Sequence, residues 1–316
     1  MDAHWNPVVV GLDATPGAAA AARVAWEIAR TAETTCYPVH AIRDQAAEVA
    51  AFQLPMDLAP MNRVLAELAQ SELKQAFGDE VPARLLERLE IRPGRPAVVL
   101  TAVAAVRDAE LIVVGGKHRG TLGRWLAGST AHDLLRLGGH PVLVTGPGAR
   151  LPRRVLAAVD LSEVAKATVE VAQRFAALFQ ADLLVLHVVE VAALVPGAVV
   201  LPGALLDDEL LLKRSEQWFD TTVWPLVHYP KADRRVVRGQ VTPVIRAQAA
   251  KWGADIVVLG SHGKNWVDRL LLGSTTERLI ADLPASLLVA PAAGASREGQ
   301  QSQLSGAGGK GGKTDG

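Results

Sequence analysis

Glycines and hydroxyl side chains gather at both ends of one connection in this chain of 316 residues, at positions 260–276. The connection follows the apolar run 255–260 and leads into the amphipathic segment 277–282. Glycine lets a backbone approach a ligand closely because it has no Cβ, and a helix entrance offers N–H groups without partners. Such a loop predicts an anion site, and we interpret it as a site for nucleotide phosphates. The residues expected to form it are Gly260, Ser261, His262, Gly263, Gly273, Ser274, Thr275 and Thr276.

The same residues have a second interpretation, because glycine and serine also gather at ordinary strand-to-helix turns. Ser274 would then simply be the N-cap of the following helix. Two observations favour the phosphate interpretation. The glycines and hydroxyls occur at both ends of the connection, and a related set occurs earlier in the chain, at Gly115, Gly128, Ser129 and Thr130.

Buried strands alternating with helices are expected to position these residues. Uniformly apolar runs that alternate with helical segments indicate a parallel sheet covered on both faces. In the first half, Thr15 as N-cap and Pro16 at the first helical position predict a helix start. Pro38 fits its predicted strand poorly, since proline removes a ladder donor. The strands expected there are 7–13, 35–42, 86–92, 110–115 and 141–145, and the helices 17–31, 57–77, 97–108 and 128–137.

The pattern restarts after about residue 150, which indicates an internal duplication. Two offsets relate the copies. Three pairs are 147 positions apart: Asp13 and Asp160, His40 and His187, Pro96 and Pro243. Three more are 145 apart: Gly115 and Gly260, Gly128 and Gly273, Ser129 and Ser274. We therefore predict domains at 1–148 and 154–292, a linker at 149–153, and a disordered Gly- and Ser-rich tail at 293–316.

The spacing Gly260-x2-Gly263-x9-Gly273-Ser274 resembles the signature of the ATP-binding branch of the universal stress protein family, and the resemblance covers both copies. It implies an α/β fold of two tandem doubly wound domains, each a five-stranded parallel sheet in the order 3-2-1-4-5 flanked by helices. The resemblance further implies that Asp160 contacts the nucleoside and Val188 the base. Asp13 is the weaker counterpart in the first copy. Alternatively, each aspartate merely caps the next helix.

The first copy departs from this signature at several positions. His118 stands where the second copy has Gly263, Ala131 replaces Thr276, and Ala41 replaces Val188. A Cβ can block the approach of a phosphate to the backbone. We therefore expect ATP, with or without Mg²⁺, to bind the second domain, and to bind the first weakly or not at all.

The net charge and the cysteine content limit the kinds of partner and compartment that we expect. The formal net charge is zero, so nothing indicates nucleic acid or an anionic membrane as the main partner. Cys36 is the single cysteine, which excludes an internal disulfide and fits a reducing compartment. An acidic N-terminus and the lack of a long apolar stretch predict a cytoplasmic protein without a transmembrane helix.

No catalytic or metal-ligating pattern stands out, so any ATP hydrolysis should be slow. Our first hypothesis is a nucleotide-responsive regulatory protein of the stress response. The alternatives are a nucleotide-independent module that binds an unknown protein partner through a fold with vestigial sites, and a slow ATPase. The resemblance implies that the last strands, about 141–145 and 285–290, pair the two domains about a pseudo-two-fold axis. A homodimer of the whole chain is compatible with this arrangement.

Overall fold

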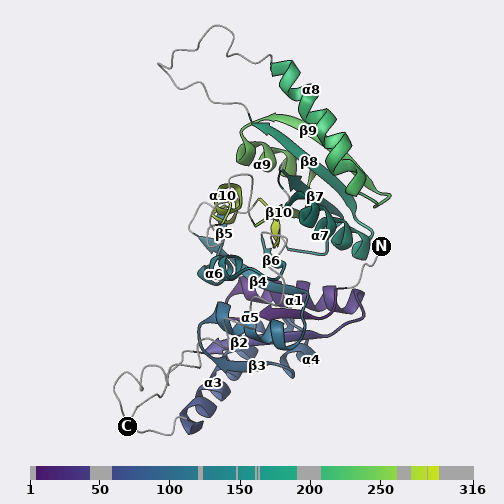
Figure 1. Ribbon diagram of the computed structural model, residues 1–316. Coiled ribbons are helices and arrows are strands. Elements are labelled where there is room, and N and C mark those ends of the chain that lie inside the picture. Colours follow the sequence, from purple (N-terminus) through teal and green to yellow (C-terminus); the bar gives the residue numbers. More distant parts are fainter. Residues whose placement is uncertain are drawn as a thin grey trace, which may run out of the picture.

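The computed structural model describes residues 5–42, 59–119, 124–146, 149–160, 162, 164–190, 208–261, 272–282 and 284–291 (Figure 1). His262, Gly263 and the predicted tail at 293–316 lie outside these ranges. Within them, the strands of the two halves join into one continuous sheet. In the first half the strands are β1 Val8–Gly11, β2 Cys36–Ile42, β3 Glu90–Pro93, β4 Leu111–Arg119, β5 Arg124–Ala127 and β6 Val142–Thr145. In the second half they are β7 Arg154–Val159, β8 Asp182–Glu190, β9 Ala232–Gly239, β10 Ile256–Gly260 and β11 Ser286–Ala290.

The strand order confirms the predicted fold class. The sheet runs β3-β2-β1-β4-β6-β11-β10-β7-β8-β9, so each half has the order 3-2-1-4-5. Neighbouring strands within each half of this sheet are parallel, as the uniformly apolar runs indicated. Strand β5 lies off this path and pairs with β4.

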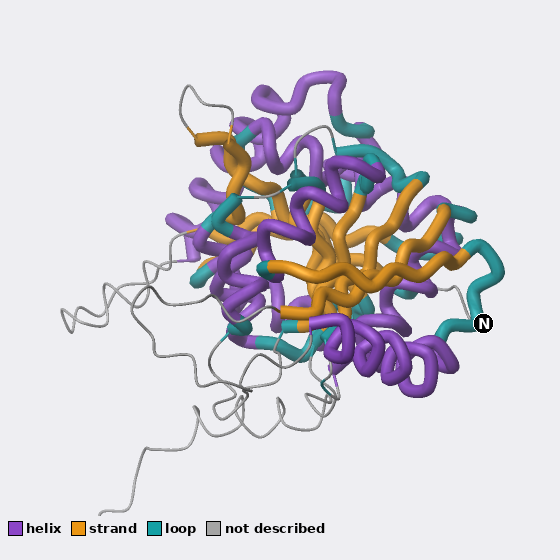
Figure 2. The backbone as a smooth tube through the Cα atoms, turned by 90° about the horizontal axis from the view of Figure 1, so that it is seen from above, coloured by secondary structure: helices purple, strands orange, loops and turns teal. Residues whose placement is uncertain are grey.

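Helices cover both faces of the sheet, and Figure 2 shows the strands as a layer between them. Val8 and Val10 join the core on one face of the sheet, whereas Val9 joins the core on the other face. This alternation explains why the strands are apolar at every position. The helices are α1 Pro16–Thr31, α3 Ala59–Phe77, α4 Ala83–Leu86, α5 Pro96–Val106, α6 Ser129–Leu137, α7 Val164–Phe179, α8 Asp208–Trp218, α9 Val241–Trp252 and α10 Ser274–Ile280, with short turns at Gly78–Glu80, Phe219–Val223 and Trp224–Leu226.

Local signals gave the start of α1 correctly. The Thr15 side chain accepts a hydrogen bond from the backbone N–H of Ala18, and Pro16 occupies the first helical position. Pro38 is accommodated because the carbonyls of Thr35 and Val39 accept from Val8 and Leu12, so the backbone nitrogen of position 38 points to the other neighbouring strand. That neighbour, β3, begins its pairing only at Val39, so the missing N–H interrupts no ladder bond.

Two segments of the first half have bounds that differ from the prediction. The strand expected at 86–92 is β3 at Glu90–Pro93, because residues 83–86 form helix α4 and bury Leu85 and Leu86. The loop expected after Gly115 is partly a β-hairpin, in which β4 continues to Arg119 and pairs antiparallel with β5. Pairing the two arms satisfies backbone groups that an open loop would leave to solvent.

The repeat register also needs one correction. His40 faces Ile91 across β2 and β3, and His187 faces Val236 across β8 and β9. Ile91 and Val236 are 145 positions apart, so the change of offset falls between the second and third strands. Gly94 and Gly239 agree with this register, with φ values of 134° and 146° just before α5 and α9. Structurally, Pro96 therefore corresponds to Val241 and not to Pro243.

The last strands of the two halves join them, as predicted. β6 and β11 pair antiparallel, with Leu143 opposite Leu288. These two residues are each other's repeat counterparts, 145 positions apart. Because counterpart residues face each other at the centre of this antiparallel pair, the pair is symmetric. This symmetry defines the expected pseudo-two-fold axis. The two halves meet near β6 in Figure 1.

A second contact between the halves involves α7. Trp5 is fully buried and meets Phe175 edge to face at 5.7 Å between ring centroids. The Arg174 guanidinium lies 4.7 Å from the centroid of the Trp5 ring and donates to the Glu110 carboxylate at 2.9 Å. Aromatic burial and a partly shielded ion pair thus hold α7 against the first half.

Cys36 belongs to the core. It is buried, and desolvation raises the pKa of its thiol to about 12.

Within the described ranges, no helix combines the length and apolar character needed to cross a bilayer.

Candidate functional site

The carboxyl ends of β7 and β10 lie at the reversal of strand order in the second half, where α/β sheets commonly bind ligands. A crevice of about 90 Å³ opens there. It brings together residues that are far apart in the sequence. Five of the predicted site residues line it: Asp160, Val188, Gly260, Thr275 and Thr276.

Neither aspartate acts as the helix cap that the alternative interpretation proposed. In the first half the N-cap is Thr15, and its hydroxyl donates to a carboxylate oxygen of Asp13. In the second half, Asp160 Oδ1 accepts from the backbone N–H of Ser162 at 3.0 Å and from the Ser162 hydroxyl. A carboxylate has about four acceptor positions, so Asp160 retains capacity for a ligand hydroxyl.

A histidine in each second strand holds the strand end that carries the aspartate. His187 Nδ1 lies 2.9 Å from the carbonyl oxygen of Val159, the residue before Asp160. His40 Nδ1 lies 2.7 Å from the carbonyl oxygen of Leu12 in the same way. Since a carbonyl only accepts, Nδ1 carries the proton in both. The sequence did not reveal this bond, because it joins different strands.

Several hydroxyl and backbone groups of the predicted phosphate loop already have internal partners. The Thr276 hydroxyl donates to the Gly260 carbonyl at 2.9 Å. The Ser261 carbonyl accepts from the N–H of Gly273 at 2.9 Å, and Ser261 N–H donates to Ala290 at 2.9 Å. These bonds fix the two ends of the loop whose middle contains His262 and Gly263, outside the described residues.

Helix α10 begins at Ser274, and its N-cap is Gly273. The alternative in which Ser274 caps the helix is therefore wrong. Ser274 instead occupies the first helical position. In the first half, α6 begins at Ser129 after Gly128 in the same way. The two helix entrances are thus built alike, and both leave a glycine at the cap.

Seven residues that line the second crevice were not predicted from the sequence, and three of them come from the starts of helices. Val164 and Thr168 come from the first turns of α7, and Val241 from the start of α9. Val164 and Thr168 are one helical turn apart after Asp160, a spacing that could have identified them. The Thr168 hydroxyl donates to the Val164 carbonyl at 3.0 Å, so its methyl group is the part suited to an apolar ligand surface.

The first half has a crevice of the same volume, about 90 Å³, at the corresponding place. The predicted residues Asp13, Gly115, Gly128 and Thr130 line it, whereas Ser129 is exposed and does not. Volume therefore does not separate the two halves. The lining does: Ala41 and Ala131 replace the valine and threonine of the second crevice, and Lys117 is present beside Gly128.

Packing accounts for Gly115 without any ligand. A Cβ added to Gly115 would lie 2.4 Å from the carbonyl carbon of Gly17, and one added to Gly17 would lie 2.0 Å from the carbonyl oxygen of Gly116. Both distances are far below contact, so the start of α1 rests directly on β4 at Gly115 and Gly116. Val164 occupies the position of Gly17 in the second half, and its side chain rules out so close an approach there.

The described residues contain no cluster of three or more histidine, cysteine, aspartate or glutamate side chains able to hold a metal ion. The groups that the second crevice offers are one carboxylate, backbone groups at Gly260, hydroxyls and an apolar wall. This set can bind a polar ligand that has an apolar face.

Comparisons with known proteins agree with the duplication. The sequence model of the universal stress protein family matches residues 4–146 and again 152–291. A universal stress protein of Mycolicibacterium smegmatis is 30% identical over 233 residues, which cover 71% of this chain and 74% of that protein. One from Mycobacterium tuberculosis is 28% identical over 289 residues, covering 85% and 91%.

Solved structures share the fold. The crystal structure of a universal stress protein from Archaeoglobus fulgidus superposes with a TM-score of 0.60 at 17% identity, covering 90% of this chain and 98% of that one. At this identity the likeness concerns the fold alone. Because the family's sequence model matches nearly all of the chain twice, the protein belongs to the universal stress protein family, as two consecutive copies of its domain.

Proposed function

We propose that this tandem universal stress protein binds ATP in the crevice of its second half and acts as a nucleotide-responsive regulatory protein. The observation that carries the proposal is the convergence of Asp160, Val188, Gly260 and Thr275 on one crevice at the reversal of strand order. Chain segments that are unrelated in sequence supply the polar and apolar groups that a nucleoside needs.

In this proposal the Asp160 carboxylate accepts hydrogen bonds from the ribose hydroxyls. Val188 and the neighbouring apolar wall contact the base. Gly260 and the entrance of α10 face the phosphates, with Mg²⁺ as their counterion. The crevice, about 90 Å³, matches only part of a nucleotide, so the loop that contains His262 and Gly263 would complete the phosphate side.

The test is calorimetric titration of Mg-ATP into the full-length chain, with Asp160→Asn and the matched variant Asp13→Asn. We expect one site per chain. Losing a charged acceptor should weaken binding by about tenfold or more for Asp160→Asn. Asp13→Asn should leave the affinity unchanged. The proposal fails if wild-type protein gives neither heat nor a thermal shift at saturating nucleotide. Equal effects of the two variants would refute the assignment to the second half.

The nucleotide-independent interaction module remains the second candidate, and one observation favours it. Thr276 and Ser261 already use their polar groups within the protein, as vestigial sites would. Titration separates the two hypotheses. Turnover of ATP during long incubation tests the third hypothesis, a slow ATPase.

We further propose four properties of this protein, which concern its domain bounds, its localisation, its oligomeric state and its nucleotide specificity. The domains are 1–148 and 154–292 with a linker at 149–153, which limited proteolysis can test. The protein is cytoplasmic, which fractionation can test. A homodimer forms through the tandem chain, which sedimentation can test. An adenine nucleotide other than ATP can compete for the site, which titration with ADP and AMP can test.

A further inference from the structure

Helix α5 of the first half lacks a polar face. Its residues Pro96–Val106 are apolar except for Thr101. Val99, Leu100 and Val103 are buried against the sheet, but Val98 and Val106 are 46% and 80% exposed. A helix that is apolar all round is normally covered on every side. One face of α5 is therefore apolar and open among the described residues.

This open face forms one wall of a groove of about 430 Å³, and the edge strand β3 forms the other. The volume lies in the usual range of small-molecule sites. Val98, Val99, Ala102, Val103 and Val106 form a stripe along it. From Val98 to Val106 the helix rises by about 12 Å at roughly 1.5 Å per residue, so the groove is long and narrow.

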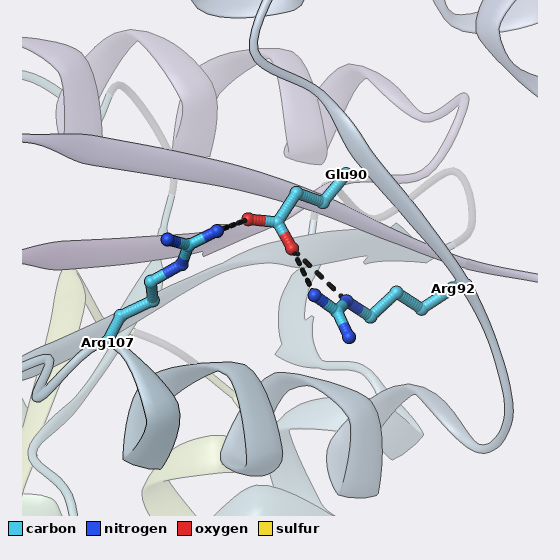
Figure 3. A network of polar contacts seen from close by, with 3 residues as sticks. All are labelled: Glu90, Arg92 and Arg107. Carbon is cyan, nitrogen blue, oxygen red and sulfur yellow. Dashed lines mark hydrogen bonds and ion pairs between the residues drawn. The ribbon is translucent and has the colours of Figure 1, made fainter.

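Two arginines line the same groove, and none of the described residues that line it is acidic. Figure 3 shows the guanidinium groups of Arg92 and Arg107 converging on the Glu90 carboxylate. Arg107 donates to Glu90 at 2.6 Å, and Arg92 donates at 2.7 and 3.1 Å. Each guanidinium has five N–H donors, and one carboxylate balances only one of the two charges. The rim therefore keeps a net positive charge and hydrogen-bond donors in a fixed place.

The corresponding surface of the second half carries different residues, although its fold is the same. In the structural register of 145 positions, Glu90 becomes Arg235, and Val103 becomes Gln248. Arg235 donates to Gln248 at 2.7 Å across the corresponding surface. The arginines themselves are replaced by Val237 and Trp252, and the exposed Val106 by Lys251. Among the described residues, the apolar stripe and the two arginines thus occur together in the first half and not at the corresponding positions of the second.

We propose that this groove binds an amphiphilic organic acid, with its carboxylate at Arg92 and Arg107 and its unbranched alkyl chain along the stripe of α5. Arginine favours carboxylates because its fork matches their geometry. A second copy of the chain is a poorer occupant. A symmetric interface must complement itself, and Glu90, the carboxylate beside the arginines of this surface, already accepts hydrogen bonds from its own Arg92 and Arg107. The proposal is independent of nucleotide binding.

The probe is decanoate, kept below its micelle concentration and titrated into the full-length chain by calorimetry, with decanol as the uncharged control. We expect saturable binding of one decanoate and at least about tenfold weaker binding of decanol, because the charged contact is lost. Val106→Glu should abolish binding, since it places a carboxylate beside the ligand's own. This position is exposed, so the variant should fold. Arg107→Gln should weaken binding by about tenfold. Lys251→Glu, at the corresponding position of the second half, should have no effect.

Five results would overturn the proposal. The first is no saturable binding of decanoate. The second is equal binding of decanoate and decanol, which would remove the role of the arginines. The third is full affinity in Val106→Glu. The fourth is a wild-type dimer in sedimentation that Val106→Glu dissociates, since the groove would then be a surface between copies. Binding to anionic phospholipid vesicles without binding to free decanoate would likewise contradict a soluble acid as the ligand.

Discussion

The two halves of this chain share a fold, a histidine bond and a crevice volume, yet they differ where a ligand would touch them. His40 and His187 make the same bond to the end of the first strand. The crevices are each about 90 Å³. The residues that keep the architecture have survived duplication in both halves, whereas the lining residues have diverged. Equivalence of fold therefore does not carry equivalence of site.

The contact between α1 and β4 is the sharpest structural difference between the halves. We expect Gly17→Val to destabilise the protein by at least about 3 kcal/mol, because the new Cβ would lie 2.0 Å from a backbone oxygen that cannot move aside cheaply. The reverse change in the second half, Val164→Gly, should cost about 1 kcal/mol through helix propensity alone. Urea unfolding measures both. Similar costs would mean that the two helix starts are packed alike.

The histidine bond should matter equally to the stability of both halves but unequally to binding. His187→Phe and His40→Phe should each cost about 1–3 kcal/mol, because a buried carbonyl loses its donor. Only His187→Phe should also weaken ATP binding, since it releases the strand end before Asp160. His187→Asn, which keeps a donor, should recover part of the affinity. Titration calorimetry at a temperature where all variants are folded measures their ATP affinity. Equal loss of ATP affinity in the two phenylalanine variants would contradict the comparison.

Thr276 and Ala131 test whether one hydroxyl distinguishes the crevices. Thr276→Ala should lower stability by about 1 kcal/mol, because its bond to the Gly260 carbonyl is lost. If the hydroxyl also serves the ligand, ATP affinity should fall with it. Thermal unfolding and titration on the same sample separate the two roles. A loss of stability with unchanged affinity would show that Thr276 serves the fold alone.

Glu90 gives the smallest predicted effect. Burial opposes its ionisation, but hydrogen bonds from Arg92 and Arg107 outweigh this and lower its pKa. A lowered pKa in the folded state adds stability above the unfolded pKa, and this stability is lost as the pH falls through the folded value. Glu90→Gln should therefore flatten the acid limb of the stability profile, by less than about 1 kcal/mol because the arginines are half exposed. Arg235→Gln, at the matching position, should leave that limb unchanged. An unaltered acid limb in Glu90→Gln would refute this.

Much of this architecture was already determined by the sequence. Apolar runs alternating with helical segments predicted the parallel sheet covered on both faces, because a strand that is apolar at every position must be buried on both sides. The Thr15 cap and Pro16 gave the start of α1, because capping is local. The repeated Asp, His and Gly residues gave the duplication. The convergence of Asp160 and Gly260 followed from strand order, which the resemblance supplied and the structure confirmed.

Only the tertiary structure decided the features that depend on contacts between distant segments. The hairpin of β4 and β5, the approach of Gly17 to Gly115 and the histidine bonds each join elements that no local pattern relates. The position of the two-residue shift in the repeat was ambiguous in sequence, because Pro96 and Pro243 matched by type, and strand pairing resolved it. The groove beside α5 arose in the same way. Its apolar helix was readable from the sequence, but which face stayed uncovered depends on what the rest of the chain packs against it.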